Sequence, residues 1–234
     1  MLYYVVLAVG VVVSLVFCYQ RRLGFSVNNL IFKLTSSLCF LLTAVFALIN
    51  NPSAHIYGSL IIMGGALGLV GDILLDLKGV YSNDMDIYLK GGFFAFLVGH
   101  IFYFGAIIYC TGMKWYLALA CILAAILVGA VTVLLEKPMQ VKYGKYKKIV
   151  FLYTTFLAIT MLTSIVTMVT SGFQTGFILL AVGSVLFLLS DVVLSGTFFG
   201  VGKDKPHHYF INHFLYYAGQ YLIAASVMFV DFVQ

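Results

Sequence analysis

Two aspartates lie in sequence runs that otherwise contain almost only apolar residues. Asp72 belongs to LGLVGDILLDL, residues 67–77, and Asp191 belongs to SDVVLS, residues 190–195. An acidic side chain in such surroundings costs a few kcal/mol of free energy unless it is paired or hydrated. Carboxyl groups kept there are candidates for acid–base catalysis or for proton-coupled transport. The alternative is a structural ion pair, for which Lys33 is the candidate partner.

Further polar residues within the apolar runs could complete such a site. Asp72 and Asp191 each stand about five residues before the end of their run, a depth of about 7 Å in a helix. Asp76 is so close to the end of its run that it either belongs to the site or is merely solvated. The other candidates for binding or orienting a substrate are Lys33, His100, Tyr103, Tyr153, His213, Tyr217 and Gln220.

No metal or cofactor site is expected. The segment HHYFINH offers three histidines, but His208 and His213 are five residues apart and do not share a helix face. The sequence contains no GxSxG elbow, Walker loop or GxGxxG element, so serine-hydrolase and nucleotide chemistry have no support. The cysteines are scattered singly and are expected to be unpaired packing residues: Cys18, Cys39, Cys110 and Cys121.

The elements that carry these residues are predicted to be membrane-spanning helices. The chain has 234 residues, of which 63% are hydrophobic and only 9% charged, and its mean hydropathy is +1.08. A soluble domain could not bury that much apolar surface, and about 20 apolar residues in a helix cross a bilayer. Because the apolar runs are continuous rather than alternating, a β-barrel is not expected. We expect an all-α integral membrane protein with one transmembrane domain of eight helices: 2–20, 30–49, 56–77, 87–110, 114–135, 149–170, 174–195 and 209–232.

The first apolar run is long and has no basic residue before it, so it is interpreted as a spanning helix rather than a signal peptide. Basic residues are distributed unevenly among the predicted loops. Among the loops on one side of the membrane, the only basic residue is Lys114. The loops on the other side, after the first, third, fifth and seventh helices, contain Arg21, Arg22, Lys78, Lys137, Lys142, Lys145, Lys147, Lys148, Lys203 and Lys205. The positive-inside rule then places both termini outside the cytoplasm, in the inner or plasma membrane if the protein is bacterial.

The net charge of +5 is explained by this topology and by attraction to anionic membrane lipids, so no nucleic-acid partner is expected. The run KPMQVKYGKYKK is interpreted as a cytoplasmic anchor, with a phosphate-binding patch as the alternative. The sequence makes no prediction of oligomeric state.

The two halves of the chain resemble each other at a shift of about 120 residues. The shift superposes polar residues in three helix pairs: Lys33 on Tyr153, Asp72 on Asp191, and His100 on Gln220. Two parallel four-helix repeats, residues 1–112 and 113–234, are therefore predicted, with a shared site at their interface. The alternative is that hydrophobic helices align with one another by composition alone.

Helical spacing places the candidates on shared faces. Gly64, Gly68, Asp72 and Asp76 repeat every four residues and form one stripe, on which the glycines would let a neighbouring helix approach closely. In the last predicted helix, His213, Tyr217 and Gln220 share a face in the same way.

Taken in order, these residues resemble the YhhN-like membrane family, which includes the lysoplasmalogenases. The likeness spans all eight predicted helices, and Lys33 and Tyr153 stand where family members carry similar residues. This sequence departs from the family in having Gly219 where alanine is usual and in lacking the proline that commonly follows the basic residue at Lys33. The motifs that carry the likeness are GDILL with Asp72, GHIFY with His100 and Tyr103, SDVVL with Asp191, and YYAGQYLI with Tyr217 and Gln220.

The resemblance implies an ether hydrolase whose substrate is a lysophospholipid. It would cleave the vinyl ether bond of a lysoplasmalogen into a fatty aldehyde and glycerophosphoethanolamine or glycerophosphocholine. That reaction begins with proton transfer to the alkene carbon and passes through an oxocarbenium ion, so it needs one protonated carboxyl group and one anion. Asp72 and Asp191 are the expected pair, without assignment of acid and base, and Lys33 would bind the phosphate or keep an aspartate ionised.

Two other classes of function remain open from the sequence. A proton-coupled transporter of a small solute or lipid would also use intramembrane acids and parallel repeats. A lipid-sensing or scaffold protein would bind without turnover.

Overall fold

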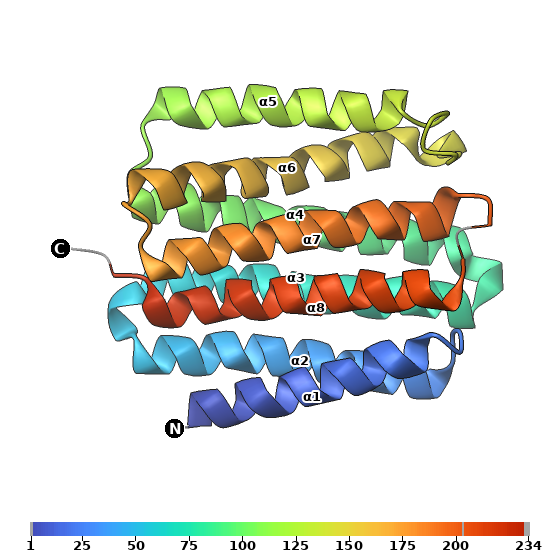
Figure 1. Cartoon of the computed structure of the whole chain (residues 1–234), viewed down its shortest axis with the longest axis horizontal. Coiled ribbons are helices and arrows are strands. Elements are labelled where there is room, and N and C mark those ends of the chain that lie inside the picture. The colour runs from blue at the N-terminus through green and yellow to red at the C-terminus, as the bar shows by residue number, and fades with distance from the viewer. Residues whose placement is uncertain (1, 203, 232–234) are drawn as a thin grey trace.

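The computed structural model describes residues 2–202 and 204–231, and this part of the chain is built of long helices (Figure 1). The only β-pairing within it is an isolated bridge between Val141 and Gly200. The all-α class is therefore confirmed. The long helices are α1 (Leu2–Arg21), α2 (Val27–Asn50), α3 (His55–Val80), α4 (Met85–Thr111), α5 (Trp115–Leu134), α6 (Lys147–Thr170), α7 (Thr175–Phe199) and α8 (Pro206–Phe229), with short 3₁₀ turns η1 (Pro52–Ala54), η2 (Ser82–Asp84) and η3 (Gly144–Tyr146).

The helices match the apolar runs to within about four residues at each end. The largest difference is at the end of α7, which continues from Ser195 to Phe199 because Phe198 and Phe199 still have partners in the hydrophobic core. The predicted end of the last helix at residue 232, like the loop residue Lys203, lies outside the described residues.

Seven of these helices, α1 to α7, are long and apolar enough to cross a membrane. The chain is therefore an integral membrane protein. The eighth predicted span, α8, runs beside the others over a similar length (Figure 1) but is not one of the seven. The helix contains several polar residues, among them Asn212, His213 and Gln220, and these three are buried inside the bundle.

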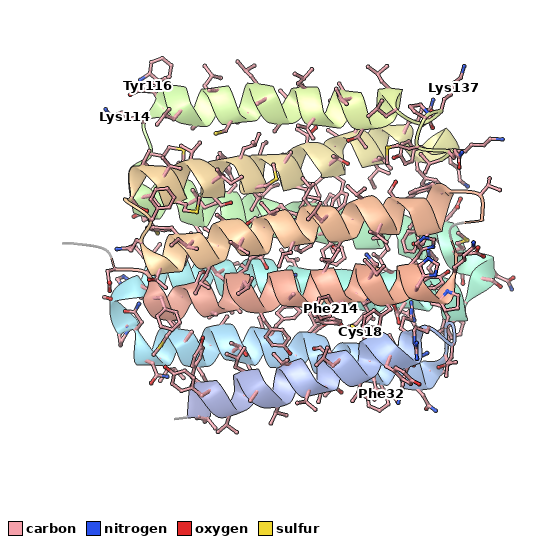
Figure 2. The ribbon with its side chains drawn as sticks, viewed as in Figure 1. Cys18, Phe32, Lys114, Tyr116, Lys137 and Phe214 are labelled. Atoms are coloured by element: carbon pink, nitrogen blue, oxygen red, sulfur yellow. The ribbon has the colours of Figure 1, made fainter. Side chains whose placement is uncertain are left out.

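Helix α8 lies against α1, α2, α3 and α7, while α5 lies at the edge of the bundle and packs on α6 (Figure 1). The first helix begins and the last helix ends at the same end of the bundle. Lys114 lies at this end and Lys137 at the opposite end, where most side-chain nitrogens gather (Figure 2). This charge asymmetry between the two ends is the pattern that the sequence predicts.

Glycines allow close helix crossings in the α3–α4 and α7–α8 pairs. In the α3–α4 pair, a Cβ atom on Gly99 would lie 3.0 Å from the carbonyl oxygen of Gly64. In the α7–α8 pair, a Cβ atom on Gly219 would lie 2.8 Å from the carbonyl oxygen of Gly183. The two crossings involve residues at equivalent positions of the two predicted repeats. The repeat itself stays a prediction, but both halves use the same packing device.

We expect Gly219→Ala to lower the stability of the folded bundle by about 1–3 kcal/mol, because the new methyl group would meet backbone that cannot move aside. The matched control is Gly105→Ala in α4, since a Cβ atom there meets nothing within 4 Å. Thermal unfolding of the purified protein in detergent measures both variants. Equal melting temperatures for the two variants would contradict the close crossing.

Candidate functional site

A buried ion-pair cluster lies near the end of the bundle where α1 ends (Figure 1). Both oxygens of Asp76 accept hydrogen bonds from Arg21, each at 2.9 Å, and Lys33 donates to Asp76 at 3.0 Å. Asp76 and Arg21 are only 1% and 2% exposed. The interpretation of Asp76 as a solvated interfacial residue is therefore wrong, as is the assignment of Arg21 to a loop. Arg21 is the last residue of α1, and its guanidinium group turns inward to Asp76.

Asp72 is held by one cation and two hydroxyl groups. Its Oδ1 atom is 3.2 Å from Lys33 Nζ, and its Oδ2 atom accepts hydrogen bonds from Ser37 at 2.6 Å and from Tyr216 at 2.7 Å. A carboxyl group that accepts from three donors, one of them charged, is stabilised in its ionised form. Lys33 thus pairs with both Asp72 and Asp76. Two roles were expected for Lys33, binding a phosphate or pairing with an aspartate, and its contacts are those of the second role.

Asp191 has a different environment. It accepts a hydrogen bond from the Tyr153 hydroxyl group, and Ser190 Oγ is 3.4 Å from its other oxygen. None of the ion pairs within residues 2–202 and 204–231 includes Asp191. The lysine–aspartate contact of the first half and the tyrosine–aspartate contact of the second half thus occupy equivalent helix pairs, α2–α3 and α6–α7.

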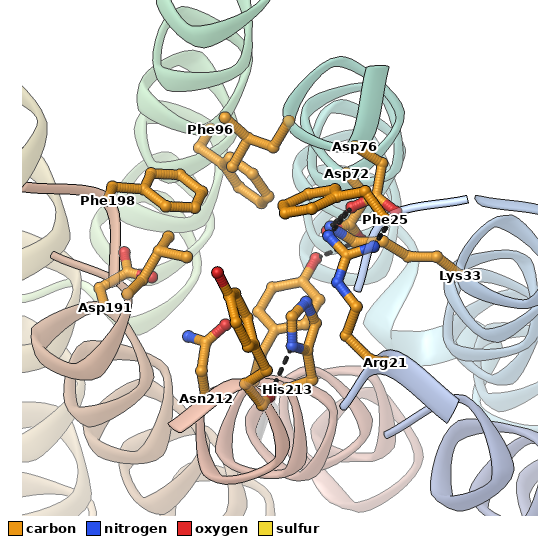
Figure 3. Close-up of a pocket in the computed structure, with 14 residues that line it drawn as sticks. Arg21, Phe25, Lys33, Asp72, Asp76, Phe96, Asp191, Phe198, Asn212 and His213 are labelled. Atoms are coloured by element: carbon orange, nitrogen blue, oxygen red, sulfur yellow. Dashed lines mark hydrogen bonds and ion pairs between the residues drawn. The ribbon is translucent and has the colours of Figure 1, made fainter. Parts of the chain in front are cut away.

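Both aspartates line one small cavity between α1, α2, α3, α4, α7 and α8 (Figure 3). Asp191 lies on one side of it, and Asp72 with Asp76 lies on the other (Figure 3). The space open to water-sized molecules is about 30 Å³, enough for one or two waters. The arrangement therefore brings two carboxyl groups in unequal surroundings to one water-sized space. Other residues that line it are Arg21, Lys33, Phe96, Asn212, His213 and Tyr216.

The other predicted residues fall into two groups around this cavity. His213 lines it, with Nδ1 2.7 Å from the Tyr209 carbonyl oxygen, and the Tyr217 hydroxyl group lies 3.1 Å from Ser37 Oγ and 3.2 Å from the Lys33 carbonyl oxygen. Tyr217 therefore acts on the residues that hold Asp72.

Gln220, Tyr103 and His100 lie deeper and do not line the cavity. Tyr103 donates to Gln220 at 3.0 Å, and Gln220 donates to the Tyr216 hydroxyl group at 3.2 Å, so this chain ends at Asp72. His100 is separate from it, with Nδ1 3.2 Å from Thr160 Oγ1. The predicted orienting role of Gln220 and Tyr103 could act only through Tyr216, and His100 has no hydrogen bond to this chain among the described residues.

Four residues of the site were missed by sequence reasoning: Arg21, Ser37, Asn212 and Tyr216. Helical spacing was the available signal for three of them, because Ser37 follows Lys33 by four residues, and Asn212 and Tyr216 precede Gln220 by eight and four. Arg21 had no such signal, since basic residues at helix ends usually reach toward water.

The YhhN family model matches residues 28–227 of the chain. The chain belongs to the YhhN family. The resemblance inferred from the sequence is thereby confirmed. No curated protein and no solved structure matches the chain. In this YhhN protein the three cavity-lining aspartates, Lys33 and Tyr216 lie inside the matched range, whereas Arg21 precedes it.

We expect Asp76→Asn to destabilise the protein by about 3–5 kcal/mol, because the buried guanidinium group of Arg21 would lose its counter-charge. Asp84→Asn is the control, since Asp84 is exposed. Thermal unfolding in detergent compares the two. A melting temperature for Asp76→Asn as high as that of Asp84→Asn would show that the pair does not stabilise the bundle.

Proposed function

We propose that this protein hydrolyses the vinyl ether bond of lysoplasmalogens within the membrane. The observation that carries the proposal is that two carboxyl groups, one held by a cation and the other by a neutral hydroxyl group, line one water-sized cavity. Membership of the YhhN family supports a lysoplasmalogenase-like activity. Vinyl ether hydrolysis requires this inequality, because one carboxyl group must deliver a proton while the other stays anionic.

We assign the acid to Asp191 and the anion to Asp72. Lys33, Ser37 and Tyr216 stabilise negative charge on Asp72, whereas Asp191 has no cationic partner among the described ion pairs. Desolvation without a counter-ion favours the neutral form of a carboxyl group. Asp191 can therefore hold the proton that the reaction consumes.

The reaction then proceeds in balanced steps. The Asp191 proton adds to the alkene carbon distal to the ether oxygen, and the positive charge develops on the carbon that bears the oxygen. Water in the cavity attacks that carbon and gives up a proton, for which Asp72 is the nearby anion. The hemiacetal then breaks its bond to the glycerol oxygen: this oxygen takes the proton from Asp72, the hemiacetal hydroxyl group returns a proton to Asp191, and a fatty aldehyde and a glycerophospho-alcohol leave. One water is consumed for each bond cleaved.

Buried basic side chains near the cavity support a phosphate-bearing substrate. Arg21, Lys33 and Lys78 are buried, and Arg21 and Lys33 pair with Asp72 and Asp76. Lys78 has no carboxylate partner among the ion pairs of the described residues and instead lies over the Phe198 ring, with Nζ 2.9 Å from the ring centroid. We propose that Lys78 and Arg21 attract the head-group phosphate.

We also propose that the end of the bundle with the basic residues is cytoplasmic, which leaves the beginning of α1 on the other side. The site would then draw its substrate from the cytoplasmic leaflet.

We expect Asp72→Asn and Asp191→Asn each to lower aldehyde release from lysoplasmenyl-ethanolamine by at least about 100-fold, because each removes one half of the acid–base pair. Asp231→Asn is the control, since Asp231 is exposed. A coupled aldehyde assay on detergent-purified protein measures the rates, and the saturated alkyl-ether analogue should release none because it has no alkene to protonate.

Near-normal turnover by either variant would overturn the assignment of the pair. If the unaltered protein releases no aldehyde, but sealed vesicles containing it take up the lipid when a proton gradient is applied, the protein is a carrier.

The orientation predicts opposite labelling of two single-cysteine variants in a cysteine-free background. In spheroplasts, a membrane-impermeant maleimide should label Lys114→Cys directly and Lys137→Cys only after permeabilisation, because the two exposed residues lie at opposite ends of the bundle (Figure 2). The reverse pattern would invert the topology.

A further inference from the structure

A second cavity adjoins the polar one and is almost entirely apolar. It has a volume of about 250 Å³ and lies between α5, α6 and α7. Its walls include Val128 and Leu135 from the α5 side, Leu157 of α6, and Leu188 and Val192 of α7. Along α7 the lining extends from Leu188 to Phe199, about 16 Å of helix. Such a space is suited to a hydrocarbon chain.

The two cavities share one wall. Asp191, Leu194 and Phe198 line both of them, and Tyr153, whose hydroxyl group donates to Asp191, lines the apolar cavity. Asp191 therefore stands where an apolar space meets a polar one. A molecule that fills both spaces would have its polar–apolar junction at this carboxyl group.

The apolar cavity opens toward lipid between α5 and α7. Leu135 and Val192 both line the cavity, yet they are 41% and 49% exposed on the outer surface of the bundle. Helix α5 packs on α6 at the edge of the bundle (Figure 1), and the cavity lies between α5, α6 and α7. In a membrane protein, a surface opening at this position faces acyl chains rather than water.

The same cavity is covered at the end of the bundle where Lys137 lies. The segment 135–146 folds across it, with Met139 in the lining, Lys142 donating to the Phe199 carbonyl oxygen at 2.8 Å, and Tyr143 3.0 Å from Ser195 Oγ. The basic run of the sequence is thus a cover for this cavity.

A second contact fixes the base of this cover. Glu136 accepts from Lys147 at 2.5 Å, and this hydrogen bond to the ammonium group holds the pKa of the Glu136 carboxyl group below its usual range. A chain would therefore enter from the bilayer and not from the aqueous side.

We infer that this cavity is the tail site of a single-chain lipid, which enters sideways between α5 and α7. The inference rests on the proposed function for the identity of that lipid as a lysoplasmalogen. It orders the substrate along the protein: the hydrocarbon chain lies in the apolar cavity, the vinyl ether lies at Asp191, and the glycerol and phosphate lie toward the polar cavity. The alkene carbon that must receive the proton lies between the ether oxygen and the hydrocarbon chain. A chain in the apolar cavity would therefore bring this carbon to Asp191, which lines that cavity.

Two tryptophan substitutions on one turn of α5 test the tail site. Val128 lines the cavity, whereas Val131 is 40% exposed and lies outside its lining. Val128→Trp should fill the cavity and lower kcat/KM for long-chain lysoplasmenyl lipids by at least about tenfold, while a substrate with a short alkenyl chain keeps its rate. Val131→Trp should leave the whole chain-length profile unchanged. Equal profiles for the two variants would overturn the tail site.

A binding measurement separates this inference from the proposed function. A lysophospholipid with a diazirine in its chain should crosslink to α5, α6 or α7 in the unaltered protein and in Val131→Trp, and less in Val128→Trp. Crosslinking with this pattern but no aldehyde release would keep the tail site and reject the hydrolase. Aldehyde release with crosslinks that map away from these helices would reject the tail site and keep the hydrolase. Thermal unfolding checks that both variants are folded, and Thr132→Phe, which also alters a lining residue, replaces Val128→Trp if that variant is not.

Discussion

A charge inside a membrane protein must find its counter-charge within the bundle, because lipid offers neither water nor ions. Here Lys33 bridges Asp72 and Asp76, and Arg21 binds Asp76 with both terminal nitrogens. These contacts join α1, α2 and α3 at one end of the molecule. The ion-pair cluster places cationic groups beside Asp72 and Asp76, whereas Asp191 is in none of the ion pairs of the described residues, and the proposed chemistry depends on that difference.

The two aspartates differ in their ion-pair and hydrogen-bond partners, and one of these differences follows the predicted repeat. In the first half the helix before the aspartate supplies a lysine, and in the second half the equivalent position supplies Tyr153. A tyrosine hydroxyl group donates a hydrogen bond without bringing a charge. Two carboxyl groups at equivalent positions thus differ in electrostatic environment although the surrounding helices are packed in the same way, with glycine crossings in both halves.

The two cavities explain how a greasy substrate and water could meet. The polar cavity has room for only one or two waters, and the apolar cavity opens to lipid. Asp191 belongs to both, so a reaction at this residue could use water from one side and a chain from the other. In the proposed complex the buried basic side chains near the polar cavity would attract the phosphate, and the covering segment 135–146 would keep the hydrocarbon chain away from water.

The sequence by itself determined the all-α class, the approximate bounds of the helices and the placement of Asp72 and Asp191 inside apolar runs, because continuous apolar runs and polar residues within them are local signals. Only the tertiary structure decided which charges pair. Arg21 follows an apolar run and looks like an ordinary basic helix end, but the packing of α1 beside α2 and α8 brings it to Asp76.

The sequence could not decide whether Tyr216 or Tyr217 is the direct partner of Asp72. The rotation of α8 about its axis decides this, and it brings the Tyr216 hydroxyl group to Asp72. The apolar cavity has no sequence signal at all, since it is the space that α5 and α7 leave unfilled. Partners and cavities depend on which helices are neighbours and how they are rotated, and an apolar run of similar residues on every side does not encode that choice locally.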